Sequence, residues 1–203
     1  MPADFKPFDK AEWLRLEKKA DELRRLTVQT TVWGGSGHIG GAMSAMDAMT
    51  ILYHRFMKLD VNNPDMEDRD RFVLSKGHCT PALYSTMAQR GFFPLEELKQ
   101  FRRIEGHMSG HAEMRHVKGV DMSTGSLGQG ISAAVGMALA GKADGRDYRV
   151  YALLGGLHML SPGANALNCP PDYVRQVAAA LLELDNEPGR PVAARLPENG
   201  EEL

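Results

Sequence analysis

Apolar residues recur every three or four positions in the first part of the chain, which predicts a helix over residues 9–25. Asp9 can cap the start of this helix, and Glu12 completes a capping box three residues later. The glycine-rich segment 34–41 predicts a turn, and a second apolar helix is expected after it, to about residue 58. The stripe of the first helix comprises Trp13, Leu16, Ala20 and Leu23.

Two short apolar runs, residues 72–74 and 149–154, predict buried parallel strands. Between them the pattern predicts helices over residues 80–91, 94–102 and 127–142, with a long loop after the second. The alternation of strand, glycine turn and helix predicts an α/β domain. We expect a mainly parallel sheet with helices on both faces.

The character of the sequence changes at residue 156. Residues 157–171 show no clear period and are rich in proline, after which a helix over 174–184 and a closing strand over 191–196 are expected. We therefore predict an N-terminal α/β domain over residues 1–156. Residues 157–203 are interpreted as an atypical remnant of the C-terminal part of the same domain, so that the fold is incomplete.

Composition narrows the class of protein. A chain of 203 residues with 43% hydrophobic and 25% charged residues fits one well-cored globular domain. A net charge of −2 does not indicate binding to nucleic acid or to an anionic membrane, which favour strongly basic proteins. The charged N-terminus lacks a signal peptide, and no apolar run approaches the roughly 18 residues of a membrane span. With only two cysteines, a reducing cytoplasmic location is expected.

Three polar, glycine-rich segments stand at the ends of apolar elements: residues 36–41 (SGHIGG), 74–78 (LSKGH) and 125–130 (GSLGQG). Glycines at the start of a helix let the backbone approach a ligand, and the N–H groups of the first turn carry partial positive charge. Such a segment can cradle a phosphate, although tight helix packing explains many glycine-rich helix starts equally well.

Three histidines accompany these segments. His78 follows a predicted strand, at the sheet edge where ligands bind, and could donate to a phosphate oxygen or simply cap its own turn. His38 lies in a glycine-flanked loop, and His111 lies in the long loop over 106–121, whose histidine spacing matches no standard zinc pattern. Cys79 is either a nucleophile or a small buried thiol.

Together these segments resemble the N-terminal, diphosphate-binding domain of transketolase, and more closely the separate N-terminal subunit of split transketolases. Residues 36–41 resemble the family's SGHPGG, and 74–78 read LSKGH as the family does. Residues 110–113 (GHAE) resemble GHPE, and 122–130 (MSTGSLGQG) match the thiamine-loop signature. The match runs from about residue 9 to 155, with all four motifs in the family order.

The resemblance implies thiamine diphosphate held with a divalent metal, and transfer of a two-carbon ketol unit between sugar phosphates in carbohydrate metabolism (the pentose phosphate pathway). It implies that His38 and His111 reach the oxygens of the donor sugar and assist proton transfers, which each cleavage of a carbon–carbon bond requires. The cofactor-binding positions that it implies are His78, Gly125, Ser126, Leu127 and Gly155.

The sequence also departs from the family pattern. Ile39 and Ala112 replace prolines, and Gly156 stands where the family's GDG supplies an aspartate to magnesium. Because a hard dication needs oxygen ligands and glycine has no side chain, we assign no metal ligand in this chain although the family uses Mg²⁺. We expect several dozen residues of the family domain to be missing between Gly156 and about residue 171.

The resemblance further implies partners. The N-terminal half lacks the pyrimidine-binding domain, so activity is expected to need a C-terminal transketolase half and self-association of such pairs. The alternative is a catalytically inactive, truncated member that acts at most as a binding or assembly module.

Overall fold

The computed structural model describes residues 9–155 of the chain. The helix expected over 174–184, the strand over 191–196, the segment 157–203 and Gly156 lie outside the described residues. The division into domains at residue 156 therefore stays a prediction.

Helix α1 spans Lys10–Gly34 and is longer than predicted. Its start is as expected, because the Asp9 carboxylate accepts a hydrogen bond of 2.7 Å from the backbone N–H of Glu12. Its end is set by Gly35, which takes a left-handed conformation with φ of 71°.

The extra turns of α1 run through residues rich in threonine and valine, which have low intrinsic helix propensity. Thr27 and Thr30 are fully buried there, so tertiary packing outweighs local preference. The predicted stripe is partly wrong: Leu16, Ala20 and Leu23 are buried, whereas Trp13 is 57% exposed.

Helix α2 spans Ile39–Ile51 and continues into a single π-helical turn, η1, over Leu52–Phe56. Its methionines Met46 and Met49 are fully buried in the core. The second predicted helix is thus confirmed, with a widened last turn.

The described sheet has two parallel strands, β1 over Arg71–Leu74 and β2 over Val150–Leu153. Arg71 pairs with Val150, and Leu74 pairs with Leu153. Both predicted strands are confirmed. Along β1, Phe72 and Leu74 belong to the main apolar cluster, while Val73 is also fully buried but lies outside that cluster. This alternation is that of a strand covered on both faces.

Four further elements connect the strands. Helix α3 (Thr80–Arg90) follows the short 3₁₀ turn η2 (Gly77–Cys79) and ends at the left-handed Gly91, as predicted. The helix predicted over 94–102 is instead a 3₁₀ segment, η3 (Leu95–Gln100). Helix α4 (Gln129–Ala143) starts two residues later than predicted, because Gly128 takes a left-handed conformation with φ of 86°.

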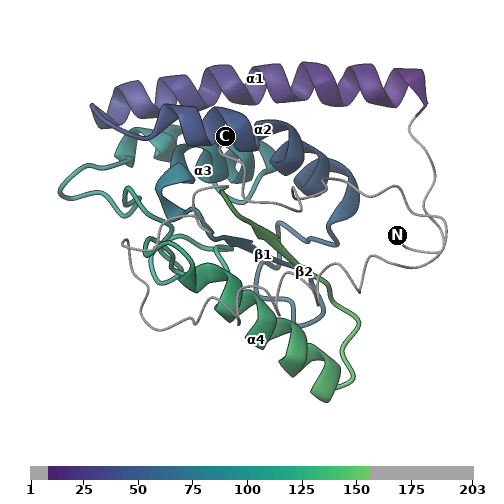
Figure 1. Ribbon diagram of the computed structural model, residues 1–203. Helices are drawn as coiled ribbons and strands as arrows, with labels where there is room; N and C mark the ends of the chain where they lie inside the picture. Colours follow the sequence, from purple (N-terminus) through teal and green to yellow (C-terminus); the bar gives the residue numbers. More distant parts are fainter. Residues whose placement is uncertain (1–8, 156–203) are drawn as a thin grey trace, which may run out of the picture. The chain divides into compact units, whose positions relative to one another are not determined.

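Helices cover both faces of the strand pair (Figure 1). Helix α4 lies along one face of β1 and β2, and α2 and α3 lie on the other, with α1 packed outside them. The predicted α/β fold with a parallel sheet is therefore confirmed in the described part of the chain. No helix within residues 9–155 has the length and apolar character to cross a membrane. The cytoplasmic location stays a prediction.

Candidate functional site

The site forms at the edge of the sheet where both parallel strands end. The backbone N–H of Ser75 donates to the carbonyl of Leu153 over 3.0 Å, which fixes the two strand ends side by side. Lys76, Gly77 and His78 leave β1 at this edge, and the register places Gly155 at the same edge, just after β2. In open α/β sheets ligands bind at this edge.

His38 and His78 meet there although they come from different loops. Their ring centroids are 5.0 Å apart, with the rings edge to face at 70°. His38 is exposed and His78 is half-buried. His38 immediately precedes α2, so the free N–H groups of the first turn of α2 lie beside the pair.

Gly41 allows this approach. A Cβ atom at Gly41 would lie 2.6 Å from the Cys79 sulfur and 3.4 Å from Nε2 of His78. The first turn of α2 can therefore lie against η2 only because residue 41 has no side chain.

Lys76 ties the same two elements together and was not among the residues singled out from the sequence. Its ammonium group is buried and donates to the carbonyl of Gly41 and to the Ser44 hydroxyl, each over 3.0 Å. Its position just after a buried strand, inside the LSKGH motif, is the sequence feature that could have identified it. These bonds hold the start of α2, which follows His38, against the turn that carries His78.

Thr124 holds the glycine loop of residues 125–128 at the end of β1. Its hydroxyl donates to the carbonyl of Leu74 over 2.6 Å, and its backbone N–H donates to the carbonyl of Ala112 over 3.0 Å. A Cβ at Gly77 would lie 2.4 Å from the carbonyl oxygen of Thr124. Thr124 therefore joins three loops, a role that its place inside the quoted motif did not reveal.

His111 lies next to the glycine loop. A Cβ at Gly125 would be 3.2 Å from Cδ2 of the His111 ring. Partial burial lowers the pKa of His111, and the neighbouring His38 and Arg102 lower it further by repulsion. The lowered pKa favours the neutral ring, in which one nitrogen accepts and the other donates a hydrogen bond.

The loop that carries His111 is braced from its other side. The Ser123 hydroxyl donates to Oε1 of Glu113 over 3.0 Å, and the same oxygen accepts from the backbone N–H of Arg115. These bonds lower the pKa of Glu113. The Glu113 carboxylate therefore stabilises the conformation of its own loop.

The structure thus brings His38, His78, His111 and Gly125 into one neighbourhood. Ser126 and Leu127 follow Gly125 in the half-buried turn before α4, where the Ser126 carbonyl accepts from the N–H of Gln129 over 3.3 Å. The roles assigned to these residues and to Gly155 stay predictions.

The chemistry of the cluster suits an anionic ligand. Imidazole groups and the N–H groups at the start of α2 lie at the end of the sheet, and a glycine turn precedes α4. A diphosphate group fits such a donor set. For a divalent metal, residues 9–155 contain no group of three His, Cys, Asp or Glu side chains close enough to hold one. Gly156, at the family's aspartate position, lies outside this range.

Cys79 is not a nucleophile of this site. Its thiol is fully buried, and burial raises its pKa, which disfavours the reactive thiolate. The interpretation as a small buried thiol is confirmed.

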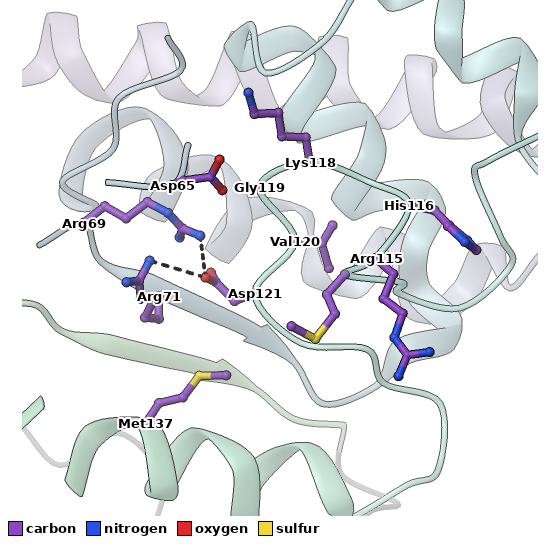
Figure 2. A pocket seen from close by; sticks show the side chains of 11 residues that line it. Asp65, Arg69, Arg71, Arg115, His116, Lys118, Gly119, Val120, Asp121 and Met137 are labelled. Carbon is purple, nitrogen blue, oxygen red and sulfur yellow. Dashed lines mark ion pairs between the residues drawn. The ribbon is translucent and has the colours of Figure 1, made fainter. Parts of the chain in front are cut away.

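An open cavity of about 600 Å³ lies at the start of β1, and none of His38, His78 and His111 lines it (Figure 2). A buried ion pair lines one side of it, in which Nη2 of Arg69 lies 2.7 Å from Oδ1 of Asp121. The other carboxylate oxygen of Asp121 accepts from the backbone N–H of Phe72 over 2.7 Å. Figure 2 shows His116 on the far side of the cavity from this pair. The Asp121 carboxylate therefore anchors the start of β1 and pairs with Arg69.

Residues 16–150 match the family model described as transketolase, thiamine diphosphate binding domain. Among curated relatives, the chain is 46% identical over 140 residues to the 6-deoxy-6-sulfo-D-fructose transketolase subunit SqwG of Clostridium sp. (strain MSTE9), covering 69% of this chain and 51% of the relative. It is 39% identical over 140 residues to one subunit of the apulose-4-phosphate transketolase of Phocaeicola vulgatus, covering 69% and 50%.

Solved structures agree with these matches. Transketolase from Leishmania mexicana superposes with a TM-score of 0.68 at 32% identity, over 72% of this chain and 24% of that one. The chain spans about half the length of the two curated relatives. The ordered motifs, the shared fold and the family match together establish that this chain belongs to the transketolase family, with the thiamine diphosphate-binding domain as its matched part.

Proposed function

We propose that the chain is the N-terminal subunit of a transketolase-type enzyme, which binds thiamine diphosphate and transfers a two-carbon ketol unit between sugar phosphates together with a partner chain. The observation that carries this proposal is the convergence of His38, His78 and His111 with the Gly125 loop at one end of the strand pair.

Each part of the cluster has a role in this proposal. His78 and the loop of Gly125, Ser126 and Leu127 bind the diphosphate, together with Gly155. His38 and His111 accept protons from the hydroxyl groups of the sugar and return them, because an imidazole group can take up a proton and release it again. When bound, thiamine diphosphate supplies the electron sink for cleavage of the carbon–carbon bond.

The partner is a chain with the pyrimidine-binding half of a transketolase. Two relatives of similar coverage are named as transketolase subunits, which supports a divided enzyme. The names of these relatives specify a sulfonated fructose and apulose 4-phosphate, so the proposed substrate class is sugars with an anionic terminal group. We further propose a cytoplasmic enzyme that self-associates. The family's Mg²⁺ has no assigned side-chain ligand in this chain, because Gly156 stands at the aspartate position.

A second candidate is an inactive family member that serves as a binding or assembly module. The observation that favours it is Gly156 in the position of the family's metal-binding aspartate. If only this carboxylate is lacking, Gly156→Asp should confer Mg²⁺-dependent binding of thiamine diphosphate. If the neighbouring segment is lacking as well, the substitution should have no effect.

The test is cofactor binding by the full chain, with and without a pyrimidine-binding partner. A ligand at one hundred times its Kd stabilises a protein by about 2.7 kcal/mol, which corresponds to a rise in Tm of about 5–10 °C. We expect this rise with thiamine diphosphate and Mg²⁺, and expect His78→Ala to abolish it.

The matched control is His107→Gln, because His107 is an exposed histidine that lies 3.0 Å from Glu97. This variant should retain the shift. If Tm does not change at millimolar cofactor in the presence of the partner, the proposal of an active enzyme subunit is refuted. Cofactor binding without two-carbon transfer would favour the second candidate.

A further inference from the structure

The cavity at the start of β1 has no part in the proposed reaction. Its volume of about 600 Å³ lies within the range of about 300–1,000 Å³ that is usual for small-molecule sites. None of the residues assigned to the cofactor or to the sugar lines it. Six of the side chains around it carry a charge: Asp65, Arg69, Arg71, Arg115, Lys118 and Asp121.

The charges around this cavity do not cancel. With His116 counted as neutral, four cations and two carboxylates give the lining a net charge of +2. One carboxylate is already used, because Asp121 pairs with the buried Arg69 over 2.7 Å. In the part of the chain that the structure describes, the lining offers one further carboxylate, Asp65, to the three other cations: Arg71, Arg115 and Lys118. A dianion would balance the lining.

Arg115 and Lys118 carry charge that is available to a ligand. Within residues 9–155, no carboxylate lies within 4 Å of the Arg115 guanidinium group or the Lys118 ammonium group. The Glu113 carboxylate attracts Arg115 electrostatically, but its Oε1 atom already accepts from the Ser123 hydroxyl and from the backbone N–H of Arg115. Both cationic residues are exposed where they line the cavity.

The loop that carries these two cations is held by its buried residues. Val117 belongs to the main apolar cluster, and its backbone N–H donates to the carbonyl of Glu113 over 3.1 Å. Gly119 has a φ of 87°, and a Cβ there would lie 2.6 Å from Cδ1 of Phe92. Because Val117 packs into the core, its polar neighbours in the loop are left at the surface of the cavity.

Arg71 supplies a third cation in a fixed position. Its Nη2 atom donates to the carbonyl of Glu67 over 3.0 Å, and its Nη1 atom lies 3.8 Å from Oδ1 of Asp121. The guanidinium group also lies over the Tyr148 ring, 5.2 Å from the ring centroid. The side chain is nevertheless 21% exposed. A guanidinium group held in this way loses little freedom when it binds an anion.

Two methionines give the cavity an apolar wall. Met114 is 49% exposed, and Met137 is half-buried. Figure 2 shows the side chain of Met137 extending from α4 towards the cavity. Methionine side chains adapt to apolar and aromatic groups of varied shape. An organic group would therefore find an apolar surface beside the cations.

We infer that this cavity is a second anion site, which binds the phosphate group of a small organic phosphate through Arg71, Arg115 and Lys118. The inference goes beyond the proposed function and does not depend on it, because the cavity shares no residue with the cofactor or sugar positions. Phosphate matches the charge of the lining, and its oxygens match the fork of a guanidinium group. The volume leaves room for an organic group against the methionines.

The test uses the full chain and phenyl phosphate as the probe, at constant pH and ionic strength. NMR would follow the ring C–H signals of His116, the N–H signal of Gly119 and the methyl signals of Met114 and Met137. We expect these signals to shift in a saturable way with a Kd in the millimolar range or below. If none of them shifts at millimolar probe, the inference is overturned.

Substitutions of the two exposed cations test their part in binding. Lys118→Gln and Arg115→Gln should each weaken binding by about fivefold or more, because each removes a charge-assisted hydrogen bond. Both side chains are exposed, so neither variant should lose its fold. Affinities equal to that of the original chain in both variants would overturn the inference.

Two control variants test where the phosphate binds. Lys18→Gln removes an exposed charge from α1, and Arg103→Gln removes one from the separate cavity beside His111. Both should leave the affinity for phenyl phosphate unchanged. If Arg103→Gln weakens binding as much as Lys118→Gln, the phosphate does not bind at the start of β1 and the inference is wrong.

Three comparisons define the ligand. Benzenesulfonate, which carries a single charge, should bind more weakly than phenyl phosphate, and equal binding would overturn the assignment to phosphate. Inorganic phosphate should also bind more weakly, and equal binding would overturn the assignment to an organic phosphate. Binding of thiamine diphosphate, measured on the same samples, should survive Lys118→Gln and Arg115→Gln. A parallel loss of both ligands would show a shared site and overturn the inference.

Discussion

Gly77 and Thr124 lie backbone to backbone at the end of β1, so close that a Cβ on Gly77 would be 2.4 Å from the carbonyl oxygen of Thr124 and 2.5 Å from its carbonyl carbon. Because both neighbours are backbone atoms, neither can rotate away. The contact sets the position of the glycine loop relative to His78. The geometry of the candidate site thus depends on the absence of one side chain.

Gly77→Ala should destabilise the fold and displace the glycine loop. Forcing a methyl group into a packed site costs about 1–3 kcal/mol, and we expect a loss of this size in urea denaturation. Gly136→Ala is the control, because a Cβ at Gly136 in α4 meets no atom within 4 Å. That variant should gain about 0.5–1 kcal/mol from helix propensity. Equal stability of the two variants would contradict this account.

Lys76→Met should loosen the contact between β1 and the start of α2. It removes two hydrogen bonds of a charged donor, a loss of about 1.5–3 kcal/mol, while the Ser44 hydroxyl still donates to the carbonyl of Gly41 over 2.9 Å. NMR should show the His38 ring signals shifting as well. Lys18→Met, on the exposed face of α1, should alter neither quantity. An unchanged His38 spectrum in Lys76→Met would show that this lysine does not position the histidine pair.

Asp121→Asn should be the most destabilising of these substitutions. It leaves Arg69, whose side chain is 7% exposed, without its carboxylate 2.7 Å away. An unpaired buried charge costs about 3–5 kcal/mol. Glu67→Gln removes an exposed carboxylate that pairs with Arg146, and should cost less than about 1 kcal/mol. Comparable unfolding midpoints in urea would refute the structural role of the Arg69–Asp121 pair.

His54 should make the fold sensitive to acid. Burial, together with repulsion from Lys19, Arg90 and Arg15, lowers its pKa to about 4. Within the described chain its Nε2 atom is buried without a hydrogen-bond partner. The unfolded chain therefore binds a proton near pH 6.5 while the folded chain does not, so stability falls between pH 6.5 and about 4.

His54→Gln should reduce this loss, measured as the dependence of Tm on pH relative to the original chain. The control is His107→Gln, whose exposed ring lies beside Glu97 and should leave the profile nearly unchanged. Parallel profiles for His54→Gln and the original chain would exclude His54 as the source.

Local sequence by itself determined much of this protein. Asp9 and Glu12 fixed the start of α1, and Gly91 ended α3, because capping and left-handed turns depend on residues a few positions apart. The apolar runs before His78 and Gly155 identified both strands, and parallel strands end at one edge of their sheet. The convergence of the three motifs followed from that rule together with the resemblance to the family.

Only the tertiary structure decided the contacts between loops far apart in the chain. It extended α1 by burying Thr27 and Thr30 against the core, and it left Trp13 exposed. It also gave Lys76 and Thr124 their partners and placed Arg102 over Gly110. Side-chain period and capping act over a few residues, whereas these contacts depend on how whole elements pack, which no local pattern encodes.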